Sequence, residues 1–109
     1  MSERPCVFCD IIARREPAEI LYEDDEILAF RNRLRWVPVM LLVVPKVHMI
    51  QDDLWEGLIT KAGPIAVQLG DKFSPGGFRL VSNFGYDAMQ SQAHAHIHIV
   101  GGMKLGEYA

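Results

Sequence analysis

The sequence predicts an α+β fold in which short antiparallel strands and one long helix share a core. The apolar pattern along the chain indicates strand, strand, strand, helix, strand and strand, without the regular alternation of strand and helix that is typical of parallel sheets. The chain has 109 residues, of which 50% are hydrophobic. This length and composition fit one compact domain over residues 1–109 with a substantial core.

The amino-terminal part predicts a short helix and then a β-hairpin. Residues 10–15 begin with Asp10 and end with basic residues, which suits the helix dipole, and Pro17 stops the helix. Residues 19–23 and 27–31 are short runs with apolar residues on either side of an acidic turn. This arrangement is typical of a hairpin.

Three further runs predict the remaining strands. Residues 39–44 are apolar on both faces and lie between Pro38 and Pro45, as expected of a strand that is covered on both sides. Residues 78–84 and 94–100 then read as strands, the first with period two and the second ended by two glycines.

The long helix is predicted to begin near Asp53, which with Glu56 forms a capping box. Gly63 and Pro64 interrupt the pattern, because proline removes a backbone hydrogen bond. We therefore expect a kink or two shorter helices there. One face of the helix is apolar and comprises Leu54, Leu58, Ala62, Ile65, Ala66 and Leu69.

Charge and composition exclude several classes of function. The 11 basic and 14 acidic residues are interspersed, so no continuous positive field for nucleic acid is expected. Residues 1–5 do not resemble a signal peptide, and residues 36–45 are about half the length of a membrane span. We therefore expect a cytoplasmic protein without a membrane segment. There, Cys6 and Cys9 would be thiols and serve as metal ligands or a redox pair.

The most informative pattern is the alternation of histidines at His94, His96 and His98. On a strand, these three imidazoles lie on one face and the apolar residues between them lie on the other. Neutral imidazole is both a nucleophile and a metal ligand. The pattern alone leaves open a three-histidine metal site or a nucleophilic histidine with supporting neighbours.

The residues around these histidines resemble the motif of the histidine triad (HIT) family. Residues 90–102 match His-x-His-x-His with its apolar continuation, and residues 45–48 match the Pro-Lys-x-His segment. Residues 6–12 and 22–25 resemble the family's amino-terminal region, so the match covers nearly the whole chain in order. The resemblance implies a five-stranded, mainly antiparallel sheet with one long helix and a short N-terminal helix.

The resemblance also implies a nucleoside phosphate site. His96 would attack the α-phosphorus and form a nucleotidyl-histidine that water hydrolyses, and His98 would donate to the phosphate. His94 and Ser91 complete the implied catalytic group, with Ser91 near the leaving group. The implied substrate-binding residues are Phe30 at the nucleobase, Asn32 at the ribose, Asn83 near the leaving group, and Gln90.

The sequence departs from the family pattern in a few places. Asn32 stands where the family usually has aspartate, and the loss of a charged acceptor weakens bonds to ribose hydroxyls by roughly 1 kcal/mol. Val39 and Met40 replace a common Gly-His or Gly-Thr pair. The tail at 103–109 lacks the aromatic, proline-containing ending of the eukaryotic purine-nucleoside branch. These departures affect the choice of subfamily more than the choice of family.

Some family members contain a structural zinc, and residue by residue its ligands correspond to Cys6, Cys9, His48 and His94. Two thiolates and two imidazoles form a natural tetrahedral zinc set with no open position for catalysis. The alternative is that the cysteines only pack beside the first helix. In that case His48 would be available to the phosphate site.

The leading functional expectation is a nucleotide phosphoramidase of the Hint-like branch that acts on an AMP-like purine nucleotide. The alternatives are a dinucleoside polyphosphate hydrolase and a non-catalytic, zinc-stabilised nucleotide-binding module. The resemblance further implies a homodimer that joins two sheets and covers an otherwise exposed strand edge.

Overall fold

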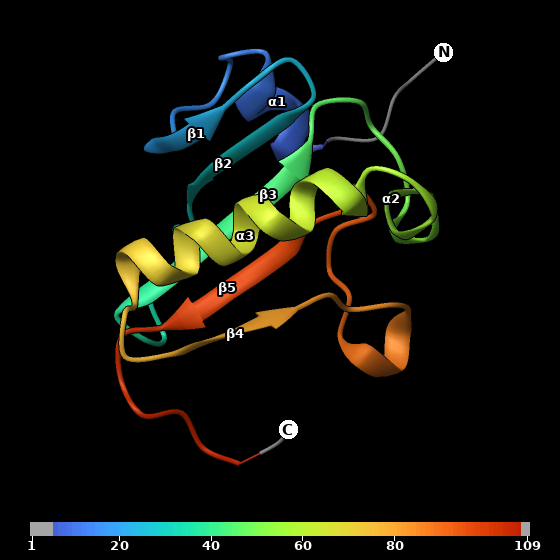
Figure 1. Ribbon diagram of the computed structural model, residues 1–109. Coiled ribbons are helices and arrows are strands. Elements are labelled where there is room, and N and C mark those ends of the chain that lie inside the picture. Colours follow the sequence, from blue (N-terminus) through green and yellow to red (C-terminus); the bar gives the residue numbers. More distant parts are fainter. Residues whose placement is uncertain (1–5, 108–109) are drawn as a thin grey trace.

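The computed structural model describes residues 6–107 and contains a five-stranded antiparallel sheet with helices on both faces (Figure 1). The strand order is β1-β2-β3-β5-β4. The predicted α+β class and five-stranded sheet are confirmed. Within the described residues, no helix is long and apolar enough to cross a membrane. The elements are α1 (Val7–Ile12), β1 (Ile20–Glu23), β2 (Ile27–Arg31), β3 (Val39–Pro45), α2 (Gln51–Glu56), α3 (Ile59–Phe73), β4 (Phe78–Val81), the 3-10 turn η1 (Tyr86–Ala88) and β5 (Ile97–Gly101).

The central strand β3 is buried along its whole length, as the sequence predicts. Leu41 and Val43 belong to the larger core beneath α3, whereas Leu42 and Val44 belong to a smaller core beneath α1. Successive side chains of a strand point to opposite faces, so β3 supplies both cores. The candidate site lies on the α1 face.

The hairpin of β1 and β2 is confirmed, and Asp24 stabilises its turn. The Asp24 carboxylate accepts hydrogen bonds from the backbone N–H groups of Glu26 and Ile27, each at 2.8 Å, and from the Tyr22 hydroxyl at 2.6 Å. The Tyr22 hydrogen bond in particular lowers the pKa of this carboxyl. Lys61 on α3 forms ion pairs with Asp24 and Glu26, which join the turn to the helix above the sheet.

Helix α1 differs from the prediction of a helix over residues 10–15. It begins at Val7, because the Cys6 sulfur caps it by accepting a hydrogen bond from the Cys9 N–H at 3.3 Å. It ends at Ile12, well before Pro17, and Arg14 adopts a left-handed conformation with φ of 63°. A left-handed residue is a common way to end a helix. The predicted position was therefore about three residues too late.

The long helical segment is divided, but at a different place from the one predicted. The break lies at Gly57 and Leu58, and α3 continues through Pro64. The capping box is wrong, since Asp53 lies inside α2 and Ile50 precedes that helix without a side-chain cap. The apolar face is confirmed as buried, and packing on the sheet outweighs the lost Pro64 hydrogen bond.

Strands β4 and β5 are shorter than predicted, because the segments 82–84 and 94–96 leave the ladder. The carbonyl of His96 accepts hydrogen bonds from the side chains of Gln51 and Ser82, each at 3.1 Å, and its N–H donates to Gln51 at 3.1 Å. The Ala95 N–H donates to the Met49 carbonyl at 2.7 Å. Side chains and a loop thus replace the strand partners at this point.

Candidate functional site: a histidine cleft and a cysteine–histidine cluster

The three alternating histidines share the face of the sheet that α1 covers. Ala95, Ile97 and Ile99 lie in the larger core on the opposite face. The rings of His96 and His98 are 4.9 Å apart between centroids. The Phe8 ring of α1 lies edge-on to His94 at 5.8 Å and to His96 at 5.3 Å. The alternation places the histidines on one face even though only His98 belongs to a strand.

A cleft of about 310 Å³ opens beside His96 and His98. Its walls come from α1, from the end of β2 with the turn that follows, and from Ser91 and Gln92. The apolar part of the lining includes Phe8, Ile11, Phe30 and Leu42. A cleft with an apolar wall and a few convergent polar groups is the usual form of a small-molecule site.

The orientation of the His96 ring leaves one of its nitrogens with a free lone pair. Its Nδ1 lies 2.8 Å from the His94 carbonyl oxygen, so Nδ1 carries the proton and donates, which leaves the lone pair on Nε2. The residue is only 2% exposed, and burial lowers the pKa of His96 below its ordinary value of 6.5. The imidazole is therefore neutral at pH 7.

His98 stands next to His96 in the cleft. It pairs in register with Leu42 on β3 and with Val81 on β4, so both neighbouring strands fix its position. Burial, together with the charge of a protonated His96, lowers the pKa of His98 to about 4. Two neutral imidazoles thus lie side by side at pH 7, and either can exchange a proton with a bound group.

The sequence reasoning missed Gln51, the first residue of α2. Its side chain is 2% exposed and contacts both backbone groups of His96 and the carbonyl of Asn83. A primary amide has an acceptor oxygen and a donor NH2 group side by side, so Gln51 can contact both backbone groups at once. Its only sequence signal is a polar residue three positions after His48, which is too general to be diagnostic.

The cleft brings together several of the residues predicted from the motif, but not all. Phe30, Asn32 and Ser91 line it beside His96 and His98, whereas Asn83 and Gln90 do not. The Gln90 side chain accepts from the Gly85 N–H at 2.7 Å and donates to the Gln92 carbonyl at 3.0 Å, so it stabilises the loop. Gln92 lies in the cleft instead.

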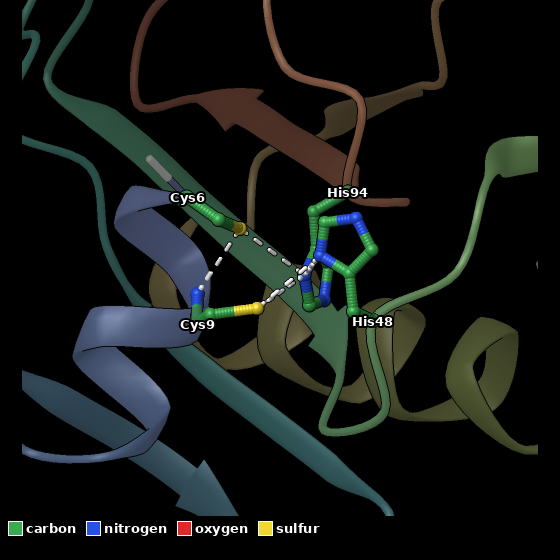
Figure 2. A group of neighbouring side chains, drawn as sticks. All are labelled: Cys6, Cys9, His48 and His94. Carbon is green, nitrogen blue, oxygen red and sulfur yellow. Dashed lines mark hydrogen bonds between the residues drawn. The ribbon is translucent and has the colours of Figure 1, made fainter. Parts of the chain in front are cut away.

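Cys6, Cys9, His48 and His94 converge beside the cleft, although they come from segments far apart in the sequence (Figure 2). Their ligand atoms all lie within 4.8 Å of one another. The Cys9 sulfur is 3.2 Å from Nδ1 of His48 and 3.5 Å from Nδ1 of His94. Tetrahedral zinc requires ligand separations of roughly 3.3–3.8 Å at usual bond lengths, so the Cys9 separations are close to those of a zinc site and the four residues could hold a metal ion.

The surroundings of the cluster favour metal binding. His94 Nε2 lies 2.8 Å from the Pro45 carbonyl and donates to it, so the Nδ1 lone pair faces the sulfurs. Burial lowers the pKa of His94, whereas burial and the neighbouring Cys6 raise the pKa of the Cys9 thiol to about 11. A divalent cation would displace the thiol protons. His94 also joins the two sites, because its carbonyl orients His96.

The chain is similar to several known proteins. The model of the HIT domain matches residues 13–105. An uncharacterised 13.1 kDa HIT-like protein of Mesomycoplasma hyorhinis is 41% identical over 86% of this chain and 89% of its own length. The adenylylsulfatase HINT1 of Arabidopsis thaliana is 33% identical over 95% of this chain and 76% of its own. The crystal structure of a HIT family hydrolase from Legionella pneumophila has a TM-score of 0.84 and 34% identity, covering 94% of this chain and 97% of that one.

Proposed function

The chain belongs to the HIT family, and from this premise we propose that it hydrolyses or transfers nucleotidyl groups through a nucleotidyl-histidine intermediate on His96. Hydrolases are found in the family, as in Legionella pneumophila. We propose a nucleoside phosphoramidate with an AMP-like purine nucleotide as the substrate. The observation that carries the proposal is the neutral, buried His96, whose Nδ1 donates to His94 and whose Nε2 lone pair is free.

The proposed reaction has two displacements at the α-phosphorus. In the first, Nε2 of His96 forms a bond to phosphorus while the phosphorus–nitrogen bond of the substrate breaks, and the leaving amine takes a proton from solvent. In the second, a water oxygen attacks phosphorus, the bond to Nε2 breaks, and the water proton passes to solvent. His96 returns to its starting form, and the His94 carbonyl stabilises the positive charge that the ring carries in between.

The lining of the cleft supports such a substrate. Phe8, Ile11 and Phe30 would provide an apolar surface for a purine, and Asn32, which also lines the cleft, would contact the ribose. His98 would donate to the phosphate and Ser91 would lie near the leaving group. The volume of about 310 Å³ is at the lower end of small-molecule sites and suits a mononucleotide.

The test is the incubation of wild type and His96→Ala with an adenosine phosphoramidate, with AMP release and intact mass both followed. We expect release by the wild type, a mass increase of one adenylyl group after a rapid quench in alkaline denaturant, in which the phosphorus–nitrogen bond is stable, and loss of both in the variant. Gln68→Ala, an exposed position on α3, serves as the matched control and should keep wild-type rates. A folded wild type that releases no AMP would contradict the proposal.

The same assay distinguishes the proposed function from two alternatives. Faster cleavage of a dinucleoside polyphosphate than of the phosphoramidate would indicate the alternative hydrolase. A non-catalytic binding module would bind AMP, yet His96→Ala would leave every rate unchanged. Asn32 is the residue that favours this second alternative, because it replaces the carboxylate that the family pattern has in the ribose position.

We further propose that Cys6, Cys9, His48 and His94 bind a structural zinc ion. When bound, the metal supplies a fourfold cross-link between the start of α1, the segment after β3 and the segment before β5, with no free coordination position. We also propose a reducing, cytoplasmic location, in which the two thiols stay available as ligands.

We propose that the protein is a homodimer. Trp55, Val67, Leu80 and Phe84 are between 40% and 47% exposed and line one apolar groove over α2, α3 and β4. Strand β4 is also an edge of the sheet. A second copy that pairs with β4 across a two-fold axis would cover both the edge and the groove.

A further inference from the structure

The end of the cleft formed by the turn after β2 is basic. Arg31, Arg33 and Arg35 contribute to the lining, and Glu19 is the one carboxylate residue among the described residues that do so. The whole chain, by contrast, has a formal net charge of −3. Positive charge is therefore concentrated at this end of the cleft against the overall charge of the protein, which favours an anionic ligand there.

The three arginines are not equivalent. Arg31 forms an ion pair with Glu19 at 3.1 Å and lies over the Phe73 ring, so its charge is already partnered. Arg33 forms an ion pair with Glu16. Arg35 only donates from Nε to the Asn32 carbonyl at 3.2 Å, and within residues 6–107 no carboxylate pairs with its guanidinium. Its terminal nitrogens are thus available to a ligand.

Asn32 adds a second donor at this place. Its side-chain oxygen accepts the Leu34 N–H at 3.0 Å, which fixes the orientation of the amide and leaves its Nδ2 amide group free to donate. That group donates and cannot accept. A ribose hydroxyl is best bound by an acceptor such as a carboxylate, whereas a donor beside an unpaired guanidinium matches the oxygens of a phosphate.

The strand register places these donors away from the α-phosphate. The Asn32 N–H bonds to the Met40 carbonyl, and Leu42, two residues further along β3, lies opposite His98 on β5. Strands β2 and β5 are two spacings apart in the sheet, which is about 10 Å. Asn32, at the start of the basic end, therefore lies about one nucleoside away from His98. An anion bound there would be distinct from the phosphate that His96 attacks.

We propose that the cleft selects nucleotides whose ribose carries a second phosphate, on the 2′ or 3′ oxygen, and that Arg35 and Asn32 bind that phosphate. The inference rests on the proposed function, since it assumes that the α-phosphate lies at His96. The inference narrows the proposed substrate class from AMP-like nucleotides in general to those with a phosphorylated ribose. Arg35 is then a specificity-determining residue for the ribose substituent.

The first experiment measures binding of AMP, adenosine 3′,5′-bisphosphate and adenosine 2′,5′-bisphosphate by calorimetry. We expect one of the bisphosphates to bind roughly tenfold or more tightly than AMP, which is the scale of one charge-assisted hydrogen bond. In Arg35→Ala this ratio should fall toward one. Arg15→Ala removes an exposed arginine outside the cleft and should keep the wild-type ratio.

Asn32→Asp replaces the donor amide by a carboxylate, which only accepts hydrogen bonds and repels a phosphate. It should weaken bisphosphate binding and strengthen AMP binding, which reverses the preference. The same set is then assayed with adenosine 5′-phosphoramidate and its 3′- and 2′-phosphorylated forms. The preferred ribose phosphate should raise kcat/KM by the same factor as it raises affinity.

The possible failures are distinguishable. Equal affinity for AMP and both bisphosphates would overturn the inference while leaving AMP release, and thus the proposed function, intact. A preference that Arg35→Ala does not change would overturn the assignment to Arg35. Arg35→Ala could also weaken the binding of a dinucleoside polyphosphate while a ribose phosphate has no effect on affinity. The arginine would then bind the leaving group, and the inference would be wrong. A strong preference in binding without any nucleotide release would contradict the proposed function instead.

Discussion

At the scale of single residues, Gln51 is predicted to matter as a positioning residue for His96. Gln51→Leu leaves the His96 N–H and the Asn83 carbonyl without their side-chain partner, and the His96 carbonyl keeps only the Ser82 hydroxyl, so we expect the free energy of unfolding to fall by about 2–3 kcal/mol. Gln51→Glu accepts from the His96 N–H but cannot donate when ionised. It should lower kcat more than it changes KM.

Urea unfolding and steady-state kinetics check this prediction. Asp52→Asn is the matched control, because Asp52 is exposed on the same turn of α2. Equal losses of kcat in Gln51→Glu and in the control would contradict the positioning role. A wild-type unfolding free energy in Gln51→Leu would show that water replaces the three hydrogen bonds.

Residues His96 and His98 also predict how stability depends on pH. Burial lowers the pKa of both in the folded state, that of His98 to about 4, whereas the unfolded value is about 6.5. Below pH 6.5 the unfolded chain therefore binds more protons than the folded one. The free energy of unfolding should be highest above pH 6.5 and decrease toward pH 4, by up to about 1.4 kcal/mol per pH unit for each group.

Urea unfolding at pH 7.5, 6.0 and 5.0 measures this slope. His98→Asn removes one of the two groups and should make the slope shallower. A free energy of unfolding that stays constant from pH 7.5 to 5.0 would show that both imidazoles can be protonated without cost in the folded protein.

At the scale of elements, α1 depends on the cysteine–histidine cluster. A helix of six residues is too short to be stable alone. Phe8 and Ile11 attach it to the sheet, and the same two side chains form part of the cleft wall. If the proposed zinc ion is bound, its removal with a chelator should therefore lower the melting temperature by about 10 °C, or ~2 kcal/mol, and weaken AMP binding.

Thermal melting with and without chelator tests this, together with metal analysis and hydrogen exchange at residues 7–12. Cys9→Ala is the control, because it should melt at the lower temperature and not respond to the chelator. Fast exchange confined to α1 is expected after metal removal. An unchanged melting temperature in a sample that has lost its metal would contradict the structural role.

Some of the helices and strands could be predicted from the sequence, and others could not. Strand β3 was predicted because a short run that is apolar on both faces and lies between two prolines is typical of a covered strand, and β2 was predicted because it follows an acidic hairpin turn. The start of α1 was not, because a cysteine sulfur is an unusual cap, and the break at Gly57 depends on packing rather than on a local signal. The Cys-x-x-Cys spacing indicates metal ligands or a redox pair, and His48 and His94 were added to it only by the family resemblance, because the fold alone brings them to the cysteines. Gln51 carries no motif at all.

At the scale of the whole molecule, the apolar groove predicts a dimer in solution. Sedimentation at micromolar concentration should give twice the mass of the chain. Val67→Lys places a charge in the groove formed by Trp55, Val67, Leu80 and Phe84, and the cost of desolvating that charge should shift the protein to monomer. Val47→Lys is the matched control, because Val47 is exposed but lies outside the groove. A monomeric wild type, or a Val67→Lys variant that still sediments as a dimer, would show that this groove is not the subunit interface.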